Sequence, residues 1–421
     1  MMKKTMLSLL LAGAAIAAGA ASVDPADASS QYKPYPSEEI PSPTPPPAAY
    51  TPFHIEHYGR HGSRWLIEDR NYDVPVEQLE KAERAGALTR KGQKVLDVLR
   101  QVRADSKGRL GELTPLGAEQ HRGIARRMAA NYPGIFRAGT PVDAKSTVVI
   151  RCILSMLNEI ETLKAIEPAL EVTTDASEAD MWYMNHHDPV KNAATDSVKR
   201  IWLRPFEKAH ANRGEYLKGL VSDAKFAADS IDCDELFRQL FEVALNMPSH
   251  AGRYPAILTE VFSPDEIDEG WRVNNAHWFL NGANTALNHN LSPTVQRHLL
   301  RNMIASADTA VASGRPSANL RFGHETMVLS LAVLLDINGY GTEHNDLETL
   351  ADSWRAYEIF PMACNIQMVF YRPENGHGDT LVKVMLNERE TYLGGMEPVS
   401  GPYYRWDDLR ERMLAKLSSR P

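Results

Sequence analysis

The chain has 421 residues, of which 43% are hydrophobic and 24% charged, a composition typical of a globular protein with a sizeable core. Its 46 Lys and Arg residues face 54 Asp and Glu residues, which gives a net charge of -8. A net acidic chain is a poor general ligand for nucleic acid or anionic membranes, so any anion it binds must meet a local cluster of Arg or Lys. The only cysteines are Cys152, Cys233 and Cys364, so the fold must rest on its core rather than on disulfides.

The N-terminus has the order of an export signal. Lys3 and Lys4 precede an apolar run from about Met6 to Ala18, and small residues follow as far as Ser22. This order predicts a cleaved signal peptide over residues 1–22 and a periplasmic or secreted mature protein. The apolar run is too short for a membrane span, and the sequence offers no second candidate downstream.

Residues 23–50 are rich in proline, above all in the stretch 41–47, and predict an extended linker or surface arm rather than a core element. The first strand is predicted over Phe53–Tyr58, where apolar and polar residues partly alternate. It ends at Gly59, directly before the turn Arg60-His61-Gly62-Ser63-Arg64.

Helical patterns follow this turn. Apolar residues at helical spacing between Val95 and Val102 predict one helix, and Thr114-Pro115 is typical of the start of a second. The β-branched run 146–150 predicts a short strand that leads into Arg151 and a further helix. Residues 166–310 carry scattered tryptophans in mostly helical segments and are interpreted as an inserted helical cap domain.

Strand character returns at Asn319–Phe322, breaks at Gly323 and gives way to a helix predicted over Glu325–Leu335. Two alternating runs, 365–371 and 380–387, predict an antiparallel hairpin. The fold class predicted is therefore α/β: a mainly parallel central sheet flanked by helices, formed by residues 51–165 and 311–421, with the helical domain inserted between them.

Three segments place Arg or His where a predicted strand ends: Arg60-His61, Arg151 and His324-Glu325. In open sheets of this class, ligands bind outside the carboxyl ends of the strands. Two guanidinium groups around a turn can hold a phosphoryl group, and a His between them can supply a nucleophilic nitrogen. The three segments together predict a site that can bind and transfer a phosphoryl group.

The turn Arg60-His61-Gly62-Ser63-Arg64 resembles the RHGxR motif of the histidine phosphatases, in the branch of acid phosphatases, phytases and multiple inositol-polyphosphate phosphatases. Segments 113–120, 146–155 and 320–326 resemble further motifs of that family, in the family's order. The run 365–388 is similar to the inositol-polyphosphate group and its bacterial relatives. The resemblance implies a histidine phosphatase-like fold and hydrolysis of small phosphate monoesters without a cofactor, with inositol polyphosphates such as phytate as candidate substrates.

The resemblance also implies roles for single residues. His61 would be the nucleophile that forms a phosphohistidine, and Glu325 would donate a proton to the leaving alcohol. The phosphoryl oxygens would be held by Arg60, Arg64, Arg151 and His324. Family members have Asp directly after the distal His, or an Ala between His and Glu; here Glu325 follows His324 directly, which makes the donor one methylene longer than Asp.

Other readings of the sequence stay open. Metal hydrolysis could use His54-x-Glu56-His57, but on a strand these two histidines point to opposite faces. The cluster 186–188 (His-His-Asp) could also hold a metal, although an isolated loop cluster is more often structural. A phosphoryl-ligand binding protein would keep the same Arg clamp, and phosphatases for sugar or other small phosphomonoesters would need no other motif; a mutase fits the export signal poorly. Cations that could line a broad substrate pocket, although most such residues are solvated helix-face charges, are Arg122, Arg126, Arg127, Lys191, Lys199 and Arg200.

Overall fold

The computed structural model describes residues 22–36, 40–211, 214–291 and 297–418. Apart from Ser22, the predicted signal peptide lies outside these ranges. The strands are β1 (Tyr50–Arg60), β2 (Pro141–Ser146), β3 (Glu171–Asp175), β4 (Ser317–Gly323), β5 (Asn365–Pro373), β6 (Leu381–Leu386), β7 (Arg389–Glu390) and β8 (Tyr403–Arg405). The helices up to residue 220 are α1 (Pro25–Ala28), α2 (Asp69–Arg84), α3 (Arg90–Ser106), α4 (Pro115–Asn131), α5 (Ile150–Ile166), α6 (Met181–Met184), α7 (Pro189–Val198), α8 (Arg204–Ala209) and α9 (Glu215–Leu220). The remaining helices are α10 (Ala224–Ser230), α11 (Cys233–Asn246), α12 (Leu258–Val261), α13 (Pro264–Gly282), α14 (Arg297–Ser313), α15 (Glu325–Leu335), α16 (Ala356–Ile359) and α17 (Trp406–Ser418).

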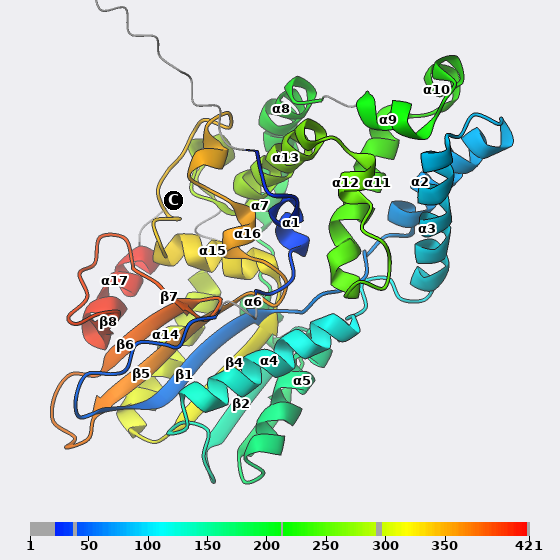
Figure 1. Ribbon diagram of the computed structural model, residues 1–421. Helices are drawn as coiled ribbons and strands as arrows, with labels where there is room; N and C mark the ends of the chain where they lie inside the picture. The colour runs from blue at the N-terminus through cyan, green and yellow to red at the C-terminus, as the bar shows by residue number, and fades with distance from the viewer. Residues whose placement is uncertain (1–21, 37–39, 212–213, 292–296, 419–421) are drawn as a thin grey trace, which may run out of the picture.

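One central sheet organises the molecule, with strand order β3-β2-β4-β1-β5-β6-β7 and β8 paired to β6 (Figure 1). The first four strands in this order are parallel, and β5, β6, β7 and β8 pair antiparallel. The predicted hairpin is present as β5 and β6. The α/β class and the parallel core of the sheet are therefore confirmed.

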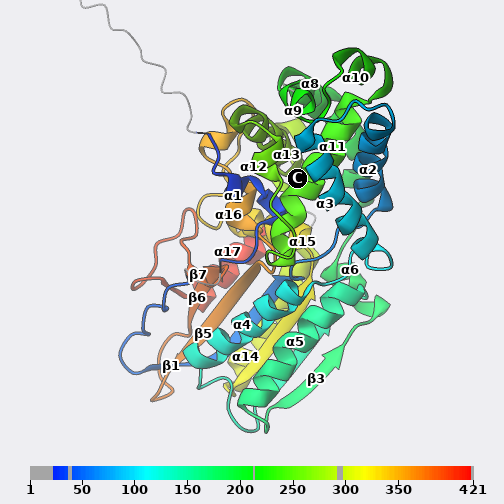
Figure 2. The same cartoon turned by 45° about the vertical axis from the view of Figure 1, so that its right-hand side comes forward.

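Helices cover both faces of this sheet. Helices α4 and α5 lie on one face and share a hydrophobic cluster with β2, β4 and Ile55 of β1 (Figure 1, Figure 2). On the other face, α14, α15 and α17 share a second cluster with Tyr58 of β1 and with β5. Side chains alternate along β1, so His57 lies on the α4 face near His121 and Phe322, whereas His54 and Glu56 lie on the α14 face.

A second, helical region stands apart from the sheet. Helices α2, α3, α9, α11, α12 and α13 share a third hydrophobic cluster. Within residues 51–165, which the sequence predicts as part of the sheet domain, α2 packs against α11 and α3 against α9 (Figure 1). The buried stripe of α2, which includes Val76 and Leu79, covers apolar side chains of the helical region rather than of the sheet. In the part of the chain that the structure describes, no helix is long and apolar enough to cross a membrane.

Two local predictions need correction. The strand predicted over residues 146–150 is instead β2, Pro141–Ser146. The bond from Thr147 N to Phe322 O (3.0 Å) is its last contact with β4 before the chain leaves the sheet, and Ile150 already begins α5. Part of the predicted arm is buried: residues 25–32 form α1 and a short 3-10 turn, and Ser29–Tyr32 are covered. Tyr32 and Tyr35 account for this, since burying aromatic rings offsets the entropy lost in ordering the segment.

Candidate active site

Two parallel strands bring the two motif histidines to one edge of the sheet. Strands β1 and β4 pair in a register that sets Arg60 opposite Gly323. His61 and His324 therefore follow at neighbouring strand ends, and His61 N donates to Gly323 O (3.0 Å). The two imidazole rings lie nearly perpendicular, with centroids 5.8 Å apart.

The loop that carries His61 fits closely onto the start of α4. A Cβ on Gly62 would lie 2.3 Å from Gly117 O, and a Cβ on Gly117 would lie 2.2 Å from Ser63 O, so neither position has room for a side chain. Gln120 accepts from Ser63 N (2.8 Å) and donates to Ser63 Oγ (3.0 Å), while Thr114 caps the helix. The segment 113–120 therefore holds the loop 61–64 in place.

The protonation of His61 is set by its surroundings. Its Nδ1 lies 2.9 Å from Gly62 O, and since a carbonyl only accepts, Nδ1 carries the proton and Nε2 the lone pair. Burial, together with the charges of Arg151, Arg60 and Arg64, holds the pKa of His61 well below its usual range. His61 is therefore a neutral imidazole with Nε2 available as a nucleophile.

Arg60 and Arg64 lie beside His61 with part of their donor capacity unused. Arg60 Nη1 donates to the backbone carbonyls of Gln31 (2.6 Å) and Phe360 (3.0 Å), and Arg64 Nη1 donates to Trp65 O (2.8 Å). Among the described residues, however, no hydrogen-bond acceptor is aligned with Arg60 Nε, Arg60 Nη2 or Arg64 Nε, although all three atoms are buried.

Arg151, the second residue of α5, completes this group of cations. It has a buried Nε that likewise finds no acceptor in the described part of the chain, and its charge acts on both motif histidines. Buried donors without an aligned acceptor cost free energy in the unliganded protein, so three guanidinium groups with such donors indicate a binding site for an anion.

Glu325 faces these cations from the first turn of α15. Its Oε2 lies 3.0 Å from Arg60 Nε and 3.8 Å from His61 Nε2, an ion pair without the alignment of a hydrogen bond. Burial raises the pKa of Glu325, but the charges of Arg60, His324 and Arg64 outweigh it and set the pKa at about 2. The carboxylate is therefore ionised and serves as an internal counter-ion to the arginines.

His324 stands between Glu325 and the end of β2. Burial, with a smaller contribution from the arginines, lowers its pKa to about 4, so its imidazole is neutral near pH 7. Its Nε2 lies 3.5 Å from Thr147 Oγ1. Gly323, just before it, is required because a Cβ there would lie 2.0 Å from Tyr58 Oη, whose oxygen accepts from His324 N (3.3 Å). The structure thus brings all the site residues predicted from the sequence to one place.

A metal ion fits this place poorly. His61, His324 and Glu325 each offer one ligand atom, these atoms lie within 4.8 Å of one another, and within the described ranges they are the only such group. The nearby guanidinium groups of Arg60, Arg64 and Arg151 oppose a second cation there. The alternative site at His54 and His57 is divided between two faces of the sheet.

The other polar clusters noted in the sequence have local partners. Asp188 accepts from the backbone N–H groups of Val190 and Lys191 and so caps α7. Arg122 and Arg126 pair with Glu119 on their own helix, and Arg127 pairs with Glu388 at 2.6 Å. Lys191 and Lys199 line a small cavity beside His277 in the helical region.

Sequence reasoning missed Gln31, Tyr32 and Glu242, which support Arg60 and Arg64. Gln31 supplies a carbonyl to Arg60, and the Tyr32 ring lies under the Arg64 guanidinium, 5.4 Å from Cζ to the ring centroid. Glu242, on α11, accepts from Tyr32 Oη at 2.5 Å. The one signal in the sequence was the occurrence of tyrosines in an otherwise proline-rich segment.

Comparisons with known proteins give the family and the fold. Residues 59–387 match the family model described as the histidine phosphatase superfamily (branch 2). No curated protein sequence matches the chain. A similar solved structure is the Bifidobacterium longum multiple inositol polyphosphate phosphatase in complex with inositol hexasulfate, with 17% identity, a TM-score of 0.76, and coverage of 93% of this chain and 98% of that chain. The phytase from D. castellii has 14% identity, a TM-score of 0.67 and coverage of 94% and 86%, and the Hafnia alvei phytase apo form has 11%, 0.54, and 89% and 98%.

Proposed function

The chain belongs to branch 2 of the histidine phosphatase superfamily and is a phosphoric monoester hydrolase, and we propose that it works through a phosphohistidine formed on His61. The observation that carries the proposal is a neutral His61 with a free Nε2, beside three guanidinium groups that each keep a buried donor without an aligned acceptor. Nε2 attacks phosphorus, the bond from phosphorus to the ester oxygen breaks, and the leaving oxygen takes a proton from Glu325. Water then attacks the phosphohistidine, its proton passes to Glu325, and phosphate leaves with His61 neutral again.

Arg60, Arg64, Arg151 and His324 hold the phosphoryl oxygens in this proposal. Positioning and charge stabilisation dominate phosphoryl transfer, which is the chemistry that fixed guanidinium groups provide. Since the Glu325 carboxylate now neutralises Arg60, an arriving phosphate must take its place there. The displaced carboxyl loses the charge that holds down its pKa and gains a neighbouring anion, so substrate binding itself favours the protonated, donating form of Glu325.

Inositol polyphosphates such as phytate are the substrates that we propose first. Support comes from the run 365–388 and from the shared fold with a phosphatase whose solved complex holds inositol hexasulfate. The fold alone does not fix the substrate, so small phosphomonoesters such as sugar phosphates are the alternative. The N-terminal pattern of residues 1–22 supports a periplasmic or secreted location.

Phosphate release tests these proposals. The purified protein is incubated with p-nitrophenyl phosphate, phytate and glucose 6-phosphate, each with and without EDTA. We expect release from p-nitrophenyl phosphate and phytate at rates that EDTA leaves unchanged. Loss of activity in EDTA would contradict the metal-free mechanism, release from glucose 6-phosphate but not phytate would favour the alternative substrates, and no release at all would favour a phosphoryl-ligand binding protein.

A further inference from the structure

The segment Val23–Lys33, here called the N-terminal strap, lies against the phosphate-binding side of the active site. Its first residue is tied to α13, where Val23 N donates to Asp268 Oδ1 (2.9 Å). Its last residue is tied to the loop before β5, where Lys33 O accepts from Met362 N (2.9 Å). Between these ties, Ser29–Tyr32 are buried, so the strap is held at both ends and covered in the middle.

The middle of the strap touches both arginines of the catalytic turn. The Gln31 carbonyl accepts from Arg60 Nη1 at 2.6 Å, and the Tyr32 ring lies beneath the Arg64 guanidinium. A cation over an aromatic face is attracted to the ring, and more strongly where water is excluded. Tyr32 is only 5% exposed, so this contact is a desolvated one.

Tyr32 also forms a hydrogen bond to Glu242. This carboxyl group from α11 accepts from Tyr32 Oη at 2.5 Å, and the charge of Arg64 also acts on it. Glu242 is partly buried, and a carboxylate and a guanidinium attract each other more strongly where water is partly excluded, so Glu242 competes with the phosphoryl group for Arg64. The Tyr32 hydroxyl satisfies the carboxylate while the ring occupies one face of the guanidinium.

We propose that Tyr32 is a positioning residue for phosphoryl transfer, which keeps Arg64 aimed at the phosphoryl group by holding Glu242 away from it. The inference rests on the proposed function, since it assigns Arg64 to the phosphoryl oxygens. It makes the strap part of the active site, although the strap contributes no group to the chemistry. It also connects the helical region, through Glu242, to the phosphate-binding turn.

The chain contains a matched control for this arrangement. Tyr35, just beyond the strap, is also buried, donates from Oη to Glu388 Oε2 (3.0 Å), and has the Arg127 guanidinium over its ring at 5.8 Å. Arg127 already forms an ion pair with Glu388, and it is not among the arginines whose charges act on His61. A substitution at Tyr35 therefore removes a similar ring from a similar Arg–Glu pair outside the catalytic turn.

The experiment measures binding of inorganic phosphate by calorimetry and hydrolysis of p-nitrophenyl phosphate for the full chain and its variants. Tyr32→Leu should weaken phosphate binding about tenfold and lower kcat/KM by a similar factor, and Tyr32→Phe, which keeps the ring, about threefold. Adding Glu242→Gln to Tyr32→Leu should restore phosphate binding to within about threefold of the wild type, because the competing charge is gone. Tyr35→Leu should lower the melting temperature and leave phosphate binding unchanged.

The outcomes separate this inference from the proposed function. If the wild type binds phosphate and hydrolyses p-nitrophenyl phosphate, but Tyr32→Leu and Tyr35→Leu behave alike, Tyr32 is merely structural and the inference fails. Failure of Glu242→Gln to restore binding would also overturn it. If Tyr32→Leu does not fold, Tyr32→Phe decides, and unchanged phosphate binding there sinks the inference. A wild type that hydrolyses no phosphomonoester contradicts the proposed function instead.

Discussion

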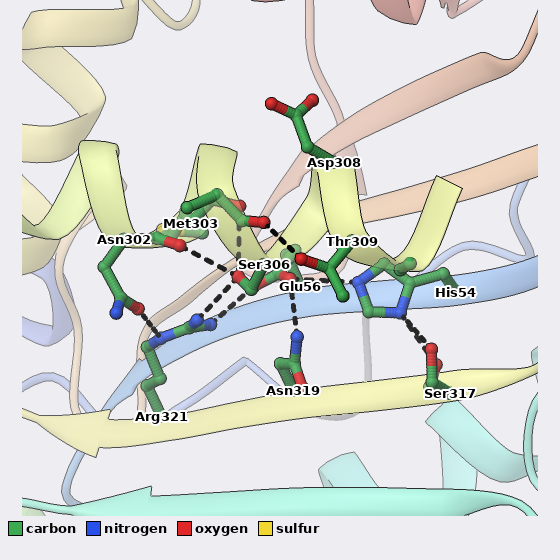
Figure 3. Close-up of polar contacts among 12 residues, drawn as sticks. His54, Glu56, Asn302, Met303, Ser306, Asp308, Thr309, Ser317, Asn319 and Arg321 are labelled. Atoms are coloured by element: carbon green, nitrogen blue, oxygen red, sulfur yellow. Dashed lines mark hydrogen bonds and ion pairs between the residues drawn. The ribbon is translucent and has the colours of Figure 1, made fainter. Parts of the chain in front are cut away.

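Strands β1 and β4 carry two buried clusters that contain the same residue types, and only one of them is a candidate active site. The inner cluster lies on the α14 face of the sheet and is drawn in Figure 3, where Arg321 and Glu56 point toward each other below α14. Glu56 also accepts from Asn319 (2.7 Å) and pairs with His54 Nε2 (2.9 Å), and Arg321 donates to Asn302 and Ser306. The outer cluster, at the ends of the same strands, has Arg60 and His61 of the turn 60–64 and Glu325 of α15.

The difference between them is hydrogen-bond satisfaction. In the inner cluster each of the three nitrogens of the Arg321 guanidinium donates a hydrogen bond to a different side chain, so the group is already bound within the protein. In the outer cluster Arg60, Arg64 and Arg151 keep buried donors that have no aligned acceptor in the described chain. Residue type alone therefore does not distinguish a structural ion cluster from a binding site, whereas unused buried donors do.

Replacing one histidine of each cluster by alanine, in separate variants, should give the largest difference in activity between the two clusters. His61→Ala removes the nucleophile and should reduce kcat/KM for p-nitrophenyl phosphate by at least about a thousandfold, with little change in melting temperature. His54→Ala removes a partner of Glu56 and should lower the melting temperature while activity per folded molecule persists. Turnover that survives His61→Ala would show that no phosphohistidine forms there.

The ion pair of the inner cluster should matter for stability rather than for catalysis. Arg321→Met leaves the Glu56 carboxylate buried without its main counter-ion, which should cost about 3–5 kcal/mol in the free energy of unfolding measured with urea. The double variant Glu56→Gln with Arg321→Met should recover part of this loss. A strong loss of kcat in the folded Arg321→Met protein would contradict the division between the clusters.

Acid should weaken the inner cluster over a defined pH range. Burial raises the pKa of Glu56, but the charges of Arg321 and His54 outweigh it and lower the pKa from 4.5 to about 2. A carboxyl with a lowered pKa stabilises the fold fully above its ordinary pKa, and this contribution is lost as the pH falls from about 4.5 to about 2. The free energy of unfolding should decline by about 3 kcal/mol across that range from Glu56 alone. The Glu56→Gln and Arg321→Met double variant should show a correspondingly shallower decline, and an equal slope would contradict the assignment.

A smaller effect, which depends on the substrate, is expected at Glu325. Glu325→Gln cannot donate a proton, so hydrolysis of alkyl phosphates should slow by about a hundredfold. Release of p-nitrophenolate, a good leaving group, should slow by about tenfold or less. Glu325→Asp restores an acid one methylene shorter and is the control for the loss of negative charge. Equal losses on both substrates would indicate that Glu325 is a counter-ion to Arg60 and not the proton donor.

Much of the outer cluster could be predicted because its signals are local. The turn 60–64, the break at Gly323 and the start of α15 each lie within a few neighbouring residues, and the register of β1 and β4 then brings them together. The motif at 113–120 is also visible in the sequence, but its support of the loop 61–64 follows only from the close contact between Gly62 and Gly117 in the structure.

What the sequence did not reveal depends on contacts between distant segments. Tyr32 and Glu242 are 210 positions apart, and nothing near either residue marks the pair. The packing of α2 and α3 also depends on partners more than a hundred positions away, since an apolar helix stripe shows that a helix is covered but not by what. Strand β2 was misplaced because β-branched residues favour extended backbone in loops as well as in strands.

The position of β1 in the sheet has a consequence for the order in which the molecule can be made. Both strand neighbours of β1 come from late in the chain, since β4 begins at residue 317 and β5 at residue 365. During synthesis β1 emerges early and has no strand partner until most of the polypeptide exists, so the sheet edge that carries His61 and His324 is among the last parts to form. Until β4 and β5 have been made, both edges of β1 stay unpaired and can pair with strands of other chains.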